Sequence, residues 1–149
     1  MAERYVLFRV GEVRYAINLS FAVQILRKKN ENILEVPRVP KYVDGVINVR
    51  GEVIPIINMR EKFGLEKEGE DKKKRIVVIR IKERIYGLLV DDVREIAEID
   101  EEVIEKEVTS VFGLKKNLIE GIAKIKDNLI VILRIEEVVK SEEEIKVAK

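Results

Sequence analysis

Arg50 is the side chain whose type and position most clearly invite chemistry. It stands beside Gly51, at the end of an apolar run that starts at Gly45. Glycine offers no side-chain cover, so a guanidinium at this position needs a partner or a contact surface. The arginine therefore predicts either an ion pair within the chain or contact with another molecule.

Residues that the sequence lacks exclude the common catalytic sites. It holds no Cys and no His, which removes disulfides, thiolate metal sites and the usual general base near neutral pH. Asp, Glu, Lys and Tyr remain as possible catalysts, but no glycine-rich phosphate loop or nucleophile elbow is present. Asp91 and Asp92 could suggest a hard-cation site, yet neighbouring carboxylates on a strand point to opposite faces. We therefore expect no enzyme, no cofactor and no metal.

A β-hairpin is the element that must position Arg50. We predict one strand over residues 45–50, a type II′ turn at Gly51-Glu52, and a return strand over residues 53–57. Pro37 and Pro40 keep the preceding segment extended. After the hairpin, Asn58 is a good helix N-cap, with Glu61 three residues on to complete a capping box.

Short strands dominate the rest of the sequence. We predict them over residues 5–10, 13–17, 33–36, 75–81, 84–90, 93–99, 118–126 and 129–133. A short helical turn is expected at residues 22–24, and helical spacing of apolar residues predicts a helix after residue 134. Strands this short at this spacing indicate an all-β barrel architecture.

Length and charge narrow the class of protein. The 149 residues suffice for one compact unit or two small ones that share a core. A net charge of +1 and 5% aromatic residues argue against nucleic acid, although a small barrel that binds oligonucleotides stays open as the alternative function. Charged residues at 38% are typical of a thermophile. No stretch is apolar enough for a signal core or a membrane span, so we expect a soluble cytoplasmic protein without direct membrane insertion.

The run GVINVRGEVIPIINM, from Gly45 to Met59, resembles the signature of the CheW family, the adaptor of bacterial chemotaxis arrays. The later run GLLVDDV, from Gly87 to Val93, is similar to a strand of the same family. The resemblance extends over residues 5–140. CheW-like modules also form the regulatory domain of the kinase CheA, but this chain is too short to include a kinase, which favours a free-standing adaptor.

The resemblance implies an all-β fold of two small five-stranded SH3/OB-like barrels packed together, with short helices and a C-terminal helix. We expect a single CheW-like domain over residues 1–149, with one subdomain at 13–74 and another at 75–140 that the N-terminal strand can join. It further implies a non-enzymatic scaffold that couples chemoreceptors (methyl-accepting chemotaxis proteins) to the histidine kinase CheA. Such a protein is associated with membrane receptor arrays.

Two binding surfaces follow from the same resemblance. One is the groove between the barrels, which receives the helical tip of a chemoreceptor, and the other lies on the first barrel and meets the CheA regulatory domain. The residues implied in receptor binding are Val23, Leu26, Asn48, Arg50, Gly51 and Val90. Those implied in kinase binding are Ile33, Leu34, Val36 and Gly45.

The sequence departs from the family pattern at Ile25, where many relatives carry an acidic residue. The acidic partner of Arg50 is then missing, and the arginine either pairs with another carboxylate or presents its charge to a partner. Plainer interpretations stay open for the other positions, since apolar residues in short strands are usually buried. Arg50 itself could be an ordinary solvated arginine at a strand end.

Overall fold

The computed structural model describes residues 2–67, 72–108 and 114–140, and strands dominate it. Within these residues the strands are β1 (Ala2–Val10), β2 (Val13–Asn18), β3 (Ala22–Arg27), β4 (Val43–Val49), β5 (Glu52–Asn58), β6 (Arg75–Ile81), β7 (Arg84–Val90), β8 (Asp92–Asp100), β9 (Ile104–Glu105), β10 (Ile119–Ile125) and β11 (Asn128–Leu133). One short helix, α1 (Met59–Lys62), follows β5, and residues 135–140 are helical. Turns of 3₁₀ helix lie at Leu19–Phe21, Lys28–Asn30, Glu101–Val103 and Lys116–Leu118.

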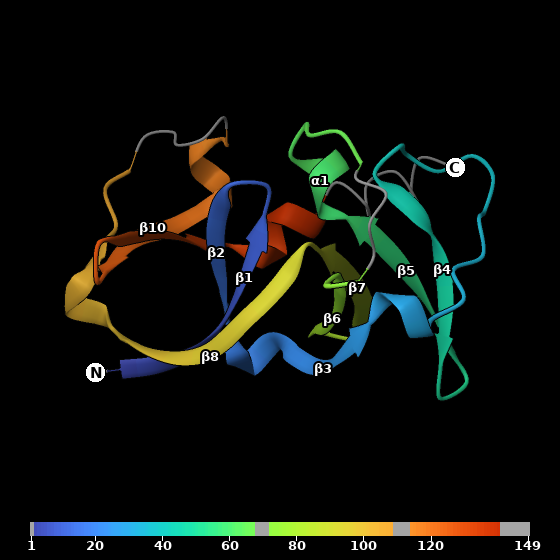
Figure 1. Ribbon diagram of the computed structural model, residues 1–149, viewed down its shortest axis with the longest axis horizontal. Helices are drawn as coiled ribbons and strands as arrows, with labels where there is room; N and C mark the ends of the chain where they lie inside the picture. Colours follow the sequence, from blue (N-terminus) through green and yellow to red (C-terminus); the bar gives the residue numbers. More distant parts are fainter. Residues whose placement is uncertain (1, 68–71, 109–113, 141–149) are drawn as a thin grey trace.

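Two curled sheets divide these strands (Figure 1). A six-stranded sheet has the order β8-β1-β2-β11-β10-β9, and a five-stranded sheet has the order β3-β6-β7-β5-β4. The prediction of an all-β fold with two β units is confirmed. The six-stranded sheet exceeds the expected five because β9, of only two residues, pairs with β10.

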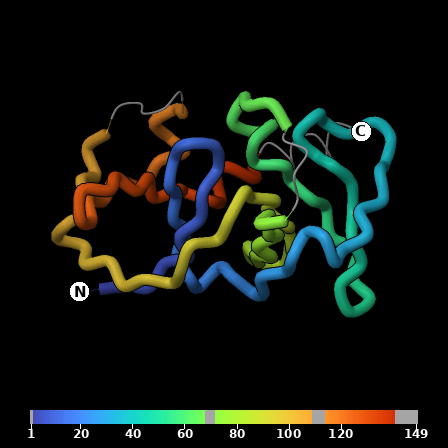
Figure 2. Tube along the Cα trace, viewed as in Figure 1, coloured from blue at the N-terminus to red at the C-terminus, as the bar shows by residue number. Residues whose placement is uncertain are grey.

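The two sheets do not divide the chain at residue 74 as we expected. β1, β2 and β8 to β11 form one sheet, so the first and last strands of the described chain belong to the same sheet, whereas β6 and β7 join β3, β4 and β5 in the other. Figure 2 shows the blue N-terminal strands and the orange and red C-terminal ones in the same half of the molecule. Parallel pairings, β11 with β2 and β5 with β7, link segments far apart in the sequence.

A shared core joins the two sheets. Phe8 and Ile17 come from the six-stranded sheet and Ile57 and Tyr86 from the five-stranded one, and all belong to one cluster of buried side chains. The helical residues 135–140 add three more, Ile135, Val138 and Val139, to the same cluster. Burying each large apolar side chain contributes roughly 1.5–3 kcal/mol. Each sheet also encloses a smaller cluster of its own.

The turn of the β4–β5 hairpin is one residue earlier than predicted. Val49 pairs with Glu52, which leaves Arg50 and Gly51 as the two central residues, with φ of 52° and 87°. Positive φ at both positions defines a type I′ turn, whereas type II′ would need it only at the first. Arg50 therefore sits at the tip of the hairpin and not at the end of a strand.

Local capping signals were predicted with more success. The Asn58 side chain accepts a hydrogen bond from the backbone N–H of Glu61 at 3.2 Å, so Asn58 is confirmed as the N-cap of α1. The backbone N–H of Asn58, however, donates to the Tyr42 carbonyl at 2.6 Å, so the second half of the expected capping box is absent.

Residues 22–24 are wrongly predicted as helical, because the 3₁₀ turn ends at Phe21 and Ala22 begins β3. The strand expected at 33–36 is reduced to a single bridge between Leu34 and Val46.

Candidate docking surfaces

The tip of the β4–β5 hairpin presents Arg50 to solvent. The side-chain oxygen of Asn48 accepts a hydrogen bond from the Gly51 N–H at 2.9 Å, which holds the turn closed. Among the described residues the Arg50 guanidinium has no hydrogen-bond or ion-pair partner. In Figure 1 this tip lies at the lower right, away from the six-stranded sheet. The structure thus leaves the charge of Arg50 available for a second molecule.

An apolar surface lies beside the same hairpin. Leu34 is 60% exposed and Val53 is 67% exposed. Together with Asn48 they line a cavity of about 360 Å³, which Glu31, Asn32, Val46 and Ile47 complete. Two backbone hydrogen bonds between Leu34 and Val46, of 2.9 and 2.8 Å, hold the residue 31–36 segment against β4. We call this region, with Arg50 at its end, the hairpin surface.

The residues expected to bind the kinase take different parts in this surface. Leu34 is on it, Val36 is half-buried, and Ile33 packs against the apolar cluster inside the five-stranded sheet. Gly45 is buried, and a Cβ added there would lie 2.2 Å from the Leu34 carbonyl oxygen. Gly45 therefore allows the Leu34 segment to approach and makes no contact of its own with solvent.

The residues expected to bind the receptor come from different strands and differ in exposure. Asn48, Arg50 and Gly51 belong to the hairpin surface, whereas Val23 lies on β3, at the other end of the strand order from β4. Val23 is 54% exposed, Leu26 is half-buried in the five-stranded sheet, and Val90 is buried in the core that both sheets share. Asn48 and Leu34, expected on different surfaces, line the same cavity.

A second apolar strip follows β3, next to the junction of the sheets. Val23 and Ile25 alternate with the more buried Gln24 and are both exposed. The 3₁₀ turn just before β3 contributes Leu19 and Phe21 to packing against the shared core, so β3 starts at this junction. Ile25, where an acidic residue was expected, lengthens the strip. We call Val23 and Ile25 the β3 surface.

Sequence reasoning missed two features of the hairpin surface and its support. Val53 was read only as part of a strand, although it alternates with the buried Ile54 and Ile56 and so faces outward. Asp91 was weighed only as a cation ligand, yet its carboxylate is buried against Arg60. Alternation could have identified Val53, but the Arg60 contact spans 31 positions and carries no local signal.

Asp91 connects the two sheets through two hydrogen-bond donors and one further ion-pair contact. Arg60 Nε donates to both carboxylate oxygens of Asp91, at 2.9 and 3.0 Å, and the backbone N–H of Gly11 donates to Oδ2 at 2.8 Å. Arg9 places a guanidinium nitrogen 3.6 Å from the same oxygen. Gly11 and Arg9 belong to the β1–β2 hairpin and Arg60 to α1, so the carboxylate joins the six-stranded sheet to the helix after β5.

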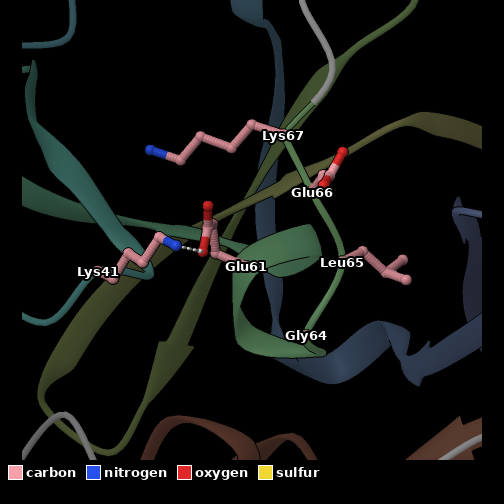
Figure 3. Close-up of a pocket in the computed structure, with 6 residues that line it drawn as sticks. All are labelled: Lys41, Glu61, Gly64, Leu65, Glu66 and Lys67. Atoms are coloured by element: carbon pink, nitrogen blue, oxygen red, sulfur yellow. Dashed lines mark ion pairs between the residues drawn. The ribbon is translucent and has the colours of Figure 1, made fainter.

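A charged depression surrounds α1. Lys41, Glu61, Gly64, Leu65, Glu66 and Lys67 line about 480 Å³ of space (Figure 3). Lys41 reaches toward Glu61, with 3.8 Å between the charged atoms, while Leu65 points away from them. A hydrogen bond to the Asp44 carboxylate, 2.9 Å away, raises the pKa of the Lys67 ammonium. Cations and anions alternate here, so the depression attracts no one sign of charge.

Neither a metal cluster nor a membrane span is found in the described part of the chain. No group of three or more Asp, Glu, His or Cys side chains there converges as metal ligands would. Within the same residues, no helix has the length and apolar character needed to cross a bilayer. The two exposed apolar surfaces and the Arg50 guanidinium are features of the described residues that another molecule could contact.

These features define a class of protein with paired β-sheets, a shared core and exposed apolar patches suited to binding other proteins. The model of the CheW-like domain family matches residues 4–143. The chain belongs to the CheW-like domain family.

Named proteins that are similar to this chain belong to the same family. The chain is 36% identical to the chemotaxis protein CheW of Helicobacter pylori, over 93% of this chain and 82% of that protein. It is 33% identical to the chemotaxis protein CheW of Thermotoga maritima, over 89% and 84% of the two chains. Its structure is similar to that of the scaffolding protein TtCheW from Thermoanaerobacter tengcongensis, with a TM-score of 0.83 and 31% identity, over 93% of this chain and 88% of that one.

Proposed function

We propose that this protein is a chemotaxis scaffold that couples chemoreceptors to the histidine kinase CheA and catalyses no reaction itself. The observation that carries the proposal is the pair of exposed apolar surfaces, at the hairpin and at β3, on a chain of the CheW-like domain family. A scaffold needs two partners bound at once. Two surfaces at different strands of one sheet allow this without a change of shape.

The hairpin surface is the proposed contact for the CheA regulatory domain. Leu34 and Val53 supply apolar contact, as the centres of protein interfaces usually do. Arg50 stands at the end of this surface and can add a charge-assisted hydrogen bond, which fixes the register of the partner. The geometry therefore supports Arg50 as part of the kinase contact, in place of the receptor contact expected from the sequence.

The β3 surface is the proposed contact for the receptor. A receptor helix can lay an apolar stripe along Val23 and Ile25, which lie in one row on an edge strand. Leu26 and Val90 take part indirectly, because they pack beneath the same sheet and keep it rigid.

Leu34→Asp tests the kinase contact. We expect the variant to bind the CheA regulatory domain at least about tenfold more weakly in isothermal titration, because a carboxylate would be buried without a partner. Leu129→Asp is the matched control, since Leu129 is 51% exposed but lies on the six-stranded sheet. Equal affinity of both folded variants for the kinase domain would refute the assignment.

Arg50→Ala tests the charge at the hairpin tip. Losing a charge-assisted hydrogen bond is expected to weaken kinase-domain binding by about tenfold, with little effect on folding. Lys82→Ala is its control, because Lys82 is also an exposed cation with positive φ, at the tip of the β6–β7 hairpin. The role of Arg50 is wrong if the two variants bind and couple alike.

Val23→Asp tests the receptor contact. Receptor-coupled kinase activation should fall in a reconstituted assay, while affinity for the isolated kinase domain stays unchanged. The exposed Val103, mutated to Asp, is the control, since it lies in the 3₁₀ turn between β8 and β9. A Val23→Asp variant that still couples fully would exclude the β3 surface.

A further inference from the structure

The six-stranded sheet has an opening between its edge strand β8 and the β10–β11 turn. Its strand order runs from β8 to β9, and no pairing joins these two ends within the described residues. A cavity of about 270 Å³ lies at this opening. Its lining residues are Leu7, Arg14, Arg94, Glu95, Ala97, Glu98, Ile125, Lys126, Asn128 and Ile130.

The floor of the cavity is apolar because it reaches the cluster inside the sheet. Leu7 and Ile130 are buried members of that cluster, and Ala97 and Ile125 pack against it. Ala97, which pairs with Tyr5 on β1, lines the cavity with a methyl group alone.

The rim carries an arginine without a partner. Arg14 is half-buried, shares the inward face of β2 with Ala16, and lies in register with Ile130 of the floor. No carboxylate or carbonyl in the described part of the chain hydrogen-bonds or ion-pairs with its guanidinium. Partly burying an unpaired charge is costly, so the site favours an anion that would satisfy Arg14.

The charges around the opening are separated by strand. Lys126, in the β10–β11 turn, adds a second cation on the side of Arg14. The carboxylates of the rim, Glu95 and Glu98, come from β8 on the opposite side. Arg94, also on β8, lies 3.6 Å from Asp92 and is partly neutralised. An anionic group is therefore directed toward β2 and the turn, and away from β8.

We propose that this opening binds a small amphiphilic anion, a monocarboxylate with an aliphatic tail. The tail occupies the apolar floor between Leu7 and Ile130, and the carboxylate accepts hydrogen bonds from Arg14. The size fits, because an apolar cavity of roughly 150 Å³ already admits benzene, and this cavity is larger, at about 270 Å³. Apolar floors with a few placed polar groups at the mouth of a β-barrel are typical of small-molecule sites.

This site is separate from the proposed scaffold function. The hairpin and β3 surfaces lie on the five-stranded sheet, and the opening lies on the six-stranded one. A negative result in the kinase or receptor assays would not affect the proposed anion site. A negative ligand titration would not affect the proposed scaffold function.

Titration of the full chain with hexanoate, followed by amide NMR shifts, tests the proposal. We expect saturable shifts confined to Leu7, Ala97, Ile125, Ile130 and their neighbours. Hexanol, which lacks the charge, and acetate, which lacks the tail, should each bind at least about tenfold more weakly, since each loses one of the two contacts. Shifts that map to the five-stranded sheet, or none at millimolar hexanoate, would overturn the site. Equal affinity for hexanol and hexanoate would show that the cavity binds only the apolar tail, and would overturn the proposed anion site.

Three variants test the roles of individual lining residues in hexanoate binding. Arg14→Gln should weaken hexanoate binding by at least about tenfold while leaving hexanol binding unchanged. Ala97→Leu should block both ligands by filling the floor, and Glu98→Gln should tighten hexanoate binding by removing a like charge. Arg80→Gln is the control, because Arg80 is an exposed strand arginine of the other sheet. An Arg14→Gln variant that keeps the native amide spectrum and full hexanoate affinity would contradict the proposal.

Discussion

Asp91→Asn is expected to destabilise the fold far more than its neutral, nearly isosteric character suggests. The Asp91 carboxylate is only 5% exposed and receives hydrogen bonds from Arg60 and Gly11, with Arg9 3.6 Å away. Asparagine offers one acceptor oxygen, and its NH₂ group must face one of these donors. The Arg60 side chain, itself 12% exposed, then loses the carboxylate charge that lies 2.9 Å from its Nε.

The expected cost is about 3 kcal/mol. Removing one partner of a buried ion pair costs about 3–5 kcal/mol. The lower end applies here, because Arg60 keeps a 3.0 Å hydrogen bond to the Glu66 carbonyl and Arg9 is exposed enough to regain water. With a urea m-value of about 2 kcal/mol/M, the unfolding midpoint should fall by about 1.5 M.

Asp92→Asn, at the neighbouring position in the sequence, is the control. Asp92 is more exposed and lies 3.6 Å from Arg94 in a surface pair, which contributes less than about 1 kcal/mol. Urea unfolding of both variants, followed by circular dichroism at one pH, gives the comparison if the m-values agree. If the two asparagine variants lose the same stability, the Asp91 carboxylate does not hold the sheets together.

Two further perturbations test backbone and burial. Gly45→Ala should cost about 3 kcal/mol by urea unfolding, because Gly45 has φ of 150° and an added Cβ would meet the Leu34 carbonyl at 2.2 Å. Gly51→Ala, with φ of 87° and open space around it, should cost only about 1 kcal/mol, and equal losses would exclude the contact. Burial raises the pKa of the Tyr15 phenol from 10.0 to about 12, so the unfolded chain loses this proton first and stability should fall as pH rises from 10 to 12. Tyr15→Phe should flatten that part of the stability profile, and an unchanged slope would contradict the assignment.

Alternation and capping made much of the fold predictable. The strand predicted over residues 13–17 is found as β2 (Val13–Asn18), and Asn58 caps α1 as predicted. The β4–β5 turn was misplaced because Gly51 fits both turn types: it can be the first central residue of II′ or the second of I′. Only the strand register, with Val49 opposite Glu52, decides between them.

Long-range pairing explains the larger errors. Nothing local in β6 or β7 indicates that β7 pairs in parallel with β5, so the boundary was placed before β6. The same pairing makes β7 a central strand, which buries Val90 and hides it from any partner. Residues predicted for the kinase surface and for the receptor surface lie side by side for a related reason. Asn48 was assigned by its motif, and its position beside Leu34 follows from a single bridge to β4.

Loss of the ion pair between Asp91 and Arg60 should also affect the two proposed contacts differently. The hairpin surface lies wholly within β4, β5 and the segment bound to them, so loosening the sheets should leave its affinity for the CheA regulatory domain within about twofold. The β3 surface begins at the junction, where the turn before β3 packs on the shared core. Asp91→Asn, assayed below its unfolding midpoint, should therefore lower receptor-coupled kinase activation while kinase-domain binding persists. Loss of both together would mean that the contacts share one rigid unit, and loss of kinase-domain binding alone would reverse the assignment of the surfaces.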